Sequence, residues 1–467
     1  MSEYTYDVLV IGAGPGGYVS AIRSAQLGLK TAIVDKQWLG GVCLNVGCIP
    51  TKALLKNAEL AHILRERAKE FGISFDNLKL DYAAAVERSR QVSKRLTNGI
   101  GFLMKKNNIA VHMGAARMTE KDTVVVTSAD GKETEIKAKN IILATGAFSI
   151  PIPGVEIDGT RILSYTEAIL QTSRPESVII IGGGAIGVEF ATVWNSYGTK
   201  TTIVEMLPRI LPLEDEEVSA ELQKIYTKRG VQILASHKVL SIEKTEKGVK
   251  VKVTSSEGEQ TLEADQALVA IGFKPNSSNL GLESLGVKLN PRGFIEINEK
   301  MATNVPGIYA IGDVTGQLLL AHVASAQGIV AAENIAGVDT VTLDYTMMPR
   351  AVYSNPQVAS FGFTETQAKE KGYKVKVGRF PFQAIGKAIA MGDYAGFIKI
   401  ITDETYGEIL GVAMIGPDVS ELLPELTLAH NAELTAAEIS RNVHAHPTLS
   451  EVLMEAAHAV EGHTIHM

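Results

Sequence analysis

Near the start of the chain stands Tyr6-Asp7-Val8-Leu9-Val10-Ile11-Gly12-Ala13-Gly14-Pro15-Gly16-Gly17, an apolar, β-branched run followed directly by a glycine-rich turn. Such a run is typical of a buried parallel strand. The segment from Tyr18 to Leu27 has the composition of a helix, and the next strand, Thr31 to Val34, ends at Asp35. This order predicts a βαβ unit whose glycines let the backbone approach a dinucleotide pyrophosphate at the helix N-terminus.

The same pattern occurs a second time. Val178 to Ile181 leads into Gly182-Gly183-Gly184-Ala185-Ile186-Gly187, and the strand after the following helix ends at Glu205. Gly182 lies 170 residues after Gly12, and Glu205 lies 170 residues after Asp35. Because glycine and acid have the same separation in both copies, we predict two dinucleotide sites. The alternative is two structural units whose glycines merely permit tight packing.

The acid of the second copy indicates which nucleotide binds there. A carboxylate at the end of this strand accepts hydrogen bonds from a ribose 2′-hydroxyl and repels a 2′-phosphate. No arginine occurs from Thr201 to Pro208, although Arg209 follows directly. Glu205 therefore favours NAD over NADP.

Length and charge exclude several classes of protein. At roughly 100–200 residues per domain, 467 residues predict several domains, and 45 Lys+Arg against 52 Asp+Glu are ordinary for a globular protein and too acidic for non-specific nucleic-acid binding. The longest apolar run, Val178 to Val188, is too short to cross a bilayer. The N-terminus has no basic region that marks secretion or import, so we expect a cytoplasmic protein, or a processed organellar form, with no membrane partner.

Small residues close several further strands. A short apolar run ends in glycine in each of three segments, as at the ligand-binding edge of a parallel sheet: Ile141 to Gly146, Ala267 to Gly272, and Gly307 to Asp313, in which Asp313 follows the glycine. Asp313 at such an edge can bind sugar or ribityl hydroxyls, or can cap a helix. From about Thr346 the composition changes, and alternating stretches such as Gly396 to Ile401 predict a separate domain with an antiparallel sheet.

Cys43 and Cys48 are the only cysteines. One disulfide cannot form the framework of a chain of this length, and no Cys/His pair nearby completes a zinc site. The remaining interpretations are a redox pair and two ordinary buried thiols. Pro50 suits the first turn of a helix, whose positive end would favour thiolate. Lys52 would share the helix face of Cys48, although a solvated lysine is the simpler interpretation.

A histidine segment stands near the other end of the chain. In Val443-His444-Ala445-His446-Pro447-Thr448-Leu449-Ser450-Glu451, a histidine with a nearby carboxylate is the arrangement of a general base. Glu451 five residues after His446 is a weak motif alone, and His444 lies on the same side of an extended segment, so spacing does not choose between them. The remaining histidines, His458, His463 and His466, suggest either a metal site or an exposed terminus.

The segments Gly40 to Lys52 and His446 to Glu451 together closely resemble the class I pyridine nucleotide-disulfide oxidoreductases, and the likeness covers essentially the whole chain. The resemblance selects His446 over His444. It implies an α/β protein with two Rossmann-like domains and a C-terminal α+β dimerisation domain. The implied division is an FAD-binding domain 1–150, an NAD-binding domain 151–275, a central domain 276–345 that completes the FAD site, and a dimerisation domain 346–467.

The resemblance also implies the cofactor contacts. The expected FAD contacts are Gly12, Gly14, Gly17, Asp35, Lys52, Gly114, Thr145, Gly146, Asp313 and Ala321. The expected NAD contacts are Gly182, Gly184, Gly187, Glu189, Glu205, Val239 and Gly272. Many members of the family carry Glu where Asp35 stands, which affects only the reach to the ribose. Lys52 is expected to pair with Glu189.

By the same resemblance, the reaction is oxidation of protein-bound dihydrolipoamide to lipoamide with reduction of NAD+. His446, oriented by Glu451, takes a thiol proton, and the thiolate attacks Cys43 of a Cys43–Cys48 disulfide, so that electrons reach FAD and then NAD. The implied partners are a second copy of the chain and either the lipoyl domains and E2 core of a 2-oxo acid dehydrogenase complex or the glycine cleavage H-protein. A related reductase of another small disulfide and a non-catalytic flavin redox sensor remain as alternatives.

Overall fold

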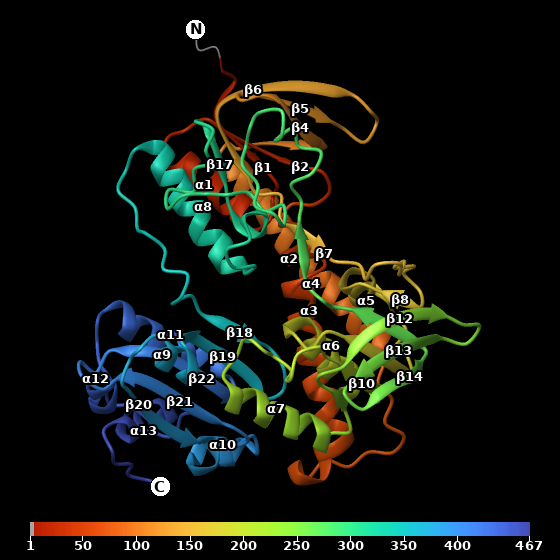
Figure 1. Ribbon diagram of the computed structural model, residues 1–467, viewed down its shortest axis with the longest axis vertical. Helices are drawn as coiled ribbons and strands as arrows, with labels where there is room; N and C mark the ends of the chain where they lie inside the picture. The colour runs from red at the N-terminus through yellow and green to blue at the C-terminus, as the bar shows by residue number, and fades with distance from the viewer. Residues whose placement is uncertain (1–3) are drawn as a thin grey trace.

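The computed structural model describes residues 4–467, arranged around a mixed seven-stranded sheet, a parallel five-stranded sheet and an antiparallel five-stranded sheet, with two smaller antiparallel sheets (Figure 1). Residues 1–3, which begin both the predicted first domain and the N-terminal segment considered for targeting, lie outside the described residues. None of the helices in the described part of the chain is long and apolar enough to cross a membrane.

The first glycine turn lies at the centre of a seven-stranded sheet. Strand β1 (Tyr6–Ile11) runs into the turn, helix α1 (Pro15–Gln26) follows, and β2 (Thr31–Asp35) returns parallel to β1. The helix predicted from Tyr18 begins earlier, because Pro15 suits a first helical turn and Gly16 permits close contact with the helix beside it. The other strands of this sheet are β3 (Ala110–Met113), β4 (Ala115–Glu120), β5 (Thr123–Thr127), β6 (Glu133–Leu143) and β17 (Ile308–Ala310).

Helices cover this sheet, and two of them, α2 (Gly41–Asn45) and α3 (Cys48–His62), carry the cysteines. Helix α8 (Ala321–Ala336) packs against α1, while α3 extends from the first fold toward the second. The remaining helical segments are η1 (Ile63–Arg67), η2 (Ala68–Phe71), α4 (Tyr82–Lys106) and η3 (Gly312–Thr315).

The second glycine turn repeats this arrangement in a five-stranded parallel sheet of order β11-β10-β9-β15-β8. Strand β9 (Ser177–Ile181) leads through the turn to α6 (Ala185–Ser196) and back to β10 (Lys200–Val204), directly before Glu205. The further elements of this region are β8 (Ile162–Leu163), α5 (Tyr165–Leu170), α7 (Glu216–Lys228), β11 (Gln232–Leu234), β12 (Lys238–Lys244), β13 (Val249–Ser255), β14 (Gly258–Ala264) and β15 (Gln266–Val269).

Apolar side chains of both folds share one core. Leu54 and Ala58 of α3 lie in the same buried cluster as Phe190 and Trp194 of α6, and Trp194 is fully buried. Short strands β7 (Ala147–Ser149) and β16 (Phe273–Pro275) also pair across the two regions. Burial of this apolar surface holds the two glycine turns in one assembly.

The C-terminal region is an antiparallel sheet of order β18-β19-β22-β21-β20, as predicted from the change in composition after Thr346. Its strands are β18 (Arg350–Val352), β19 (Gln357–Gly362), β20 (Val375–Pro381), β21 (Phe397–Asp403) and β22 (Ile409–Gly416). Its helical segments are α9 (Glu365–Glu370), η4 (Phe382–Ala384), α10 (Gly386–Met391), α11 (Val419–Asn431), α12 (Ala436–Arg441) and α13 (Glu451–Val460).

The alternation from Gly396 to Ile401 does not produce a solvent-exposed face, because every residue of β21 is buried. Ile398 and Ile400 pack in a core with residues of α11 and α13. On the other side, Phe397 joins the core shared by α3 and α6. The sheet therefore lies between the C-terminal helices and the second dinucleotide fold, as Figure 1 shows.

Candidate functional site

The two cysteines lie at the junction of two helices. Cys43 belongs to the short helix α2, and Cys48 is the first residue of α3, so the predicted helix begins at the second cysteine. No disulfide bond joins the two cysteines in this structure, and their side chains hydrogen-bond to each other. The hydrogen bond from Cys43, together with the positive charge of Lys52, lowers the pKa of Cys48 to about 7. The same hydrogen bond raises the pKa of Cys43, which therefore keeps the shared proton.

Lys52 connects α3, the helix that begins at Cys48, to the second dinucleotide fold. Its ammonium Nζ lies 2.9 Å from both carboxylate oxygens of Glu189, a buried residue of α6. The backbone N–H of Tyr353 donates a further hydrogen bond of 3.0 Å to Glu189 Oε1, and Nζ lies 4.5 Å from the centroid of the Tyr353 ring. A buried carboxylate requires such partners. The pair expected from the family resemblance is thus present.

The two glycine turns have the same geometry. Gly12 and Gly182 have φ of 106° and 108°, and a Cβ on either would overlap a carbonyl oxygen of the neighbouring strand end. A Cβ on Gly17 or Gly187 would likewise overlap the carbonyl oxygen of the first glycine of its own turn.

The middle glycine of each turn differs from the other two in having open space beside it. No atom lies within 4 Å of a Cβ built on Gly14 or Gly184. Both residues directly precede a long helix, at the N-cap position. Open space in front of a helix N-terminus is where a pyrophosphate fits, since the free N–H groups and the helix dipole favour its charge. The chain therefore fits a dinucleotide at both turns.

The strand-end acids also correspond. Asp35 Oδ2 accepts a hydrogen bond from the N–H of Ala13 at 2.7 Å, and Glu205 Oε2 accepts one from the N–H of Gly183 at 2.6 Å. Each carboxylate thus holds the glycine turn of its own fold. A carboxylate has about four acceptor positions, so capacity for a ribose hydroxyl remains at both.

Asp313 has the properties of a ligand contact. It lies in η3 rather than capping a helix, and removal of its carboxylate from water raises its pKa to about 6. No residue between 4 and 467 donates a hydrogen bond to this carboxylate. A desolvated acceptor without a protein donor fits a ribityl or sugar hydroxyl.

The other expected FAD contacts occupy positions near the first turn. The N–H of Gly114 bonds the carbonyl oxygen of Asp35, Thr145 and Gly146 follow β6 and bond Asn276, and Ala321 begins α8. At the second turn, the N–H of His237 bonds the carbonyl of Glu205 and brings the start of β12, with Val239, beside that acid. Gly272 follows β15 with a φ of 126°.

The histidine segment distinguishes the two residues that spacing leaves equivalent. Nδ1 of His446 lies 2.9 Å from Glu451 Oε1, and Glu451 Oε2 accepts the N–H of Thr448 at 2.8 Å. His444 instead engages both ring nitrogens, with the carbonyl of Asn442 and with Glu425 Oε1. The His444 side chain is 3% exposed and that of His446 is 77% exposed, so only His446 can offer Nε2 to another molecule.

The tail histidines pair locally. Nδ1 of His458 lies 3.2 Å from Nε2 of His463, and Nδ1 of His466 lies 2.6 Å from the buried Glu455. No group of three or more potential ligands in the part of the chain that the structure describes is arranged to hold a metal ion.

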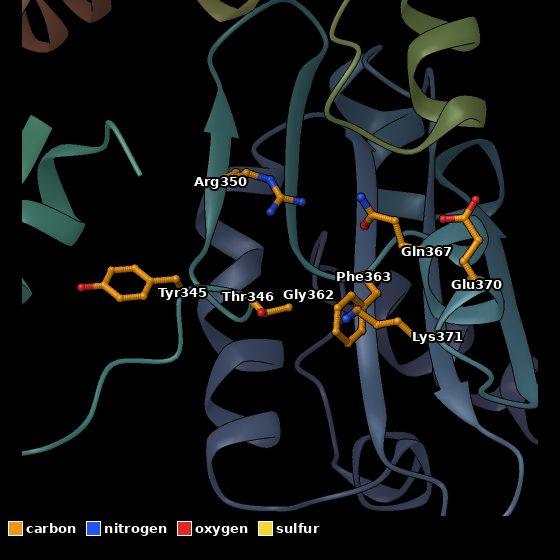
Figure 2. A pocket seen from close by; sticks show the side chains of 8 residues that line it. All are labelled: Tyr345, Thr346, Arg350, Gly362, Phe363, Gln367, Glu370 and Lys371. Carbon is orange, nitrogen blue, oxygen red and sulfur yellow. The ribbon is translucent and has the colours of Figure 1, made fainter. Parts of the chain in front are cut away.

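A cavity of about 340 Å³ lies beside β18 and α9, away from both glycine turns in the sequence and in the fold (Figure 2). Its lining residues are Tyr345, Thr346, Arg350, Gly362, Phe363, Gln367, Glu370 and Lys371. None of these is a predicted site residue.

Sequence reasoning did not find Tyr353. Its role in the Lys52–Glu189 pair depends on its backbone N–H and on the face of its ring. A backbone donor carries no residue-type signal, and Tyr353 lies far along the chain from both partners. Only the docking of β18 and the segment after it against α6 reveals it.

Known proteins share this sequence and geometry. Residues 6–328 match the family described as pyridine nucleotide-disulphide oxidoreductase, and residues 348–457 match the dimerisation domain of the same family. The chain belongs to this family of flavin- and NAD-dependent oxidoreductases.

Within that family, the chain is 53% identical to a dihydrolipoyl dehydrogenase of Mycobacterium leprae, over 98% of this chain and 99% of that protein. It is 50% identical to a dihydrolipoyl dehydrogenase of Corynebacterium glutamicum over the full length of both. Among solved structures, LpdA from Mycobacterium tuberculosis superposes with a TM-score of 0.90 at 27% identity, covering 97% of this chain and 99% of that one.

The pKa of Cys48 provides the first prediction. Replacing Cys43 by Ala removes the hydrogen-bond donor to the Cys48 thiolate, and replacing Lys52 by Met removes a nearby positive charge, so each change should raise the pKa of Cys48 from about 7 toward the ordinary value of a thiol. The measurement is thiolate absorbance of the reduced protein in the far ultraviolet against pH. Replacing the distant exposed Lys250 by Met is the control, and an unchanged titration in both test variants would contradict the assignment.

Proposed function

We propose that this chain oxidises protein-bound dihydrolipoamide to lipoamide and reduces NAD+ to NADH. The observation that carries the proposal is the thiol pair at the start of α3, linked through Lys52 and Glu189 to the helix that follows the second glycine turn. Full-length identity of 53% to a dihydrolipoyl dehydrogenase supports the same substrate.

The proposed catalytic residues are Cys43, Cys48, His446 and Glu451. Glu451 accepts from Nδ1 of His446 and so leaves Nε2 free to take a proton from a dihydrolipoyl thiol. The thiolate attacks Sγ of Cys43, the Cys43–Cys48 bond breaks, and Cys48 leaves as thiolate, consistent with its lowered pKa. The second lipoyl thiol then displaces Cys43 and closes the lipoamide ring, so the substrate loses two electrons and the cysteine pair gains them.

The proposed cofactor contacts are those expected from the sequence. The first turn would hold FAD, which would supply an acceptor for the electron pair of the dithiol, and the second turn would hold the NAD+ that is reduced to NADH. Gly12, Gly14 and Gly17 provide the approach to one pyrophosphate, and the second turn provides the other. Glu189 holds Lys52 in place, and the positive charge of Lys52 lowers the pKa of the Cys48 thiol.

We also propose the domain division 1–150, 151–275, 276–345 and 346–467. The separate sheets of the structure support three of these units. Residues 276–345 contribute β17 and α8 to the first fold, in keeping with a region that completes the FAD site.

As partners we propose a second copy of this chain and the lipoyl domains of a 2-oxo acid dehydrogenase complex or the glycine cleavage H-protein. A dimerisation domain of the family covers residues 348–457, which include His446 and Glu451. His446 is 77% exposed, so the base is open to contact from outside its own chain. A cytoplasmic location, or a processed organellar form, accords with such partners.

Substrate choice tests the main proposal. Purified enzyme should reduce NAD+ with dihydrolipoamide and should show little turnover with glutathione disulfide and NADPH. Replacing Cys43 by Ser should abolish lipoamide turnover while yellow FAD remains bound, because a serine hydroxyl cannot form the mixed disulfide. Unaltered turnover in that variant would refute the assignment of Cys43, and a reducible disulfide without NADH formation in the wild type would favour the redox-sensor alternative.

Nucleotide preference tests Glu205. Wild type should bind NADH far more tightly than NADPH, because a 2′-phosphate would meet a buried carboxylate. Glu205→Gln keeps one acceptor for the N–H of Gly183 or Leu207 and removes the charge, so it should narrow the preference, and Glu205→Arg should narrow it further or reverse it. Equal use of both nucleotides by the wild type would show that Glu205 does not set the preference.

Subunit complementation tests the proposed dimer. If each site takes Cys43 and Cys48 from one chain and His446 and Glu451 from the other, a heterodimer of Cys43→Ser and His446→Gln chains has one intact site. Activity should then reappear, up to about half the wild-type value per dimer. Heterodimers that form but remain inactive would show that each chain supplies its own base.

A further inference from the structure

A buried lysine of the C-terminal sheet gathers three carboxylates from two other elements. Lys399, on β21, is 3% exposed, and its Nζ lies 3.2 Å from Asp215 Oδ2, 2.7 Å from Glu217 Oε1 and 2.7 Å from Glu365 Oε2. Asp215 and Glu217 stand at the start of α7 in the second dinucleotide fold, and Glu365 begins α9. Asp215 also caps α7 by accepting the N–H of Glu217.

Lys399 is the buried cation of this cluster. Lys369 pairs with Glu365 and Arg379 pairs with Glu217, but both cations are more than half exposed and are therefore screened by water. Without Lys399, the carboxylates of α7 and α9 would face one another across a partly buried space and repel. The amine thus holds the start of α7 against the sheet.

The residue before this cluster is anchored to the same sheet. Glu214 is buried and accepts a hydrogen bond from Ser360 Oγ at 2.5 Å and one from Arg350 Nε at 3.3 Å. Ser360 lies on β19 and Arg350 on β18. Figure 2 shows Arg350 extending from its strand at the edge of the cavity described above.

The other end of the same loop forms the second glycine turn. Between Glu205 and Asp215 the chain returns to the turn, where the N–H of Leu211 donates to the carbonyl of Gly183 at 2.8 Å. The N–H of Gly183 in turn donates to Glu205, and the buried side chain of Ile210 packs beside Gly183. One loop therefore contacts the expected nucleotide site at one end and Lys399 at the other.

We propose that Lys399 is a positioning residue for the second nucleotide site: its ion pairs with Asp215 and Glu217 hold the loop from Glu205 to Asp215 in the conformation that binds NAD. This inference rests on the proposed function only in assigning NAD to the second turn. It means that a side chain of the C-terminal sheet sets nucleotide affinity in a different part of the chain. The opposite face of the same strand packs against α13, which begins at Glu451, so one strand supports both the base and the nucleotide loop.

The test is Lys399→Met in the FAD-loaded enzyme. Two quantities are measured: the Kd of NAD+ by calorimetry on the oxidised enzyme, and KM and kcat for NADH with ferricyanide as acceptor, which needs no cysteine chemistry. The Kd and KM should each rise about tenfold, while kcat at saturating NADH stays within about twofold, because the loop and not the reacting atoms is displaced. FAD content and the thermal midpoint are recorded in parallel.

Matched variants separate positioning from general stability. Lys399→Arg keeps the buried charge and should restore most of the affinity. Asp215→Asn keeps an oxygen to cap α7 but loses the charge that pairs with Lys399, so it should also raise KM. If Lys399→Met does not fold, this variant tests whether the ion pair positions the loop. Lys250→Met, at an exposed lysine of β13, should leave Kd and KM unchanged.

Two outcomes would overturn the inference: folded Lys399→Met or Asp215→Asn enzyme with unchanged Kd and KM, or a loss of kcat and thermal midpoint with no change in KM. The proposed function fails separately, if the wild type binds NAD+ but does not oxidise dihydrolipoamide. In that case the effect of Lys399 on NAD+ affinity remains measurable.

Discussion

The ion pair between Lys52 and Glu189 is the interaction on which the rest of the arrangement depends. The buried carboxylate of Glu189 on α6 needs a cation as its partner. Lys52 supplies this cation because α3 crosses from the first fold to the second. The apolar faces of the same two helices close the contact around Leu54 and Trp194. Because α3 begins at Cys48, the contact that joins the two folds also places the thiol pair between them.

Charge is distributed around this helix in a way that suits thiol chemistry. Lys52 lies one turn after Cys48, and the Cys43 thiol donates to the Cys48 sulfur, so the anion is stabilised at one sulfur and the proton is kept at the other. In the dithiol form, the two sulfurs therefore differ in charge. Elsewhere, burial of the Asp313 carboxylate, to which no described residue donates a hydrogen bond, raises its pKa.

Both faces of the C-terminal sheet are covered by other parts of the chain. One face packs α13, whose first residue orients His446, and the other face meets the second dinucleotide fold through Phe397 and Lys399. The helix that follows His446 and the loop from Glu205 to Asp215 therefore both contact this sheet, although they lie far apart in the sequence.

Sequence patterns alone predicted the two dinucleotide folds, the antiparallel C-terminal sheet and a helix beside the cysteines. These features follow from local rules: strand composition, glycine where the backbone must approach another chain segment, and an acid at a fixed distance from each glycine turn. Resemblance to a family added the choice of His446 and the pairing of Lys52 with Glu189.

Contacts between residues far apart in the sequence became visible only in the folded chain. It showed His444 buried against Glu425 and His446 exposed, although their spacing makes them equivalent. It also showed that Lys399, which no sequence motif points to, is a buried partner of Asp215. The physical reason is that periodicity describes which face of a strand a residue occupies, whereas the element that covers that face comes from packing between distant parts of the chain.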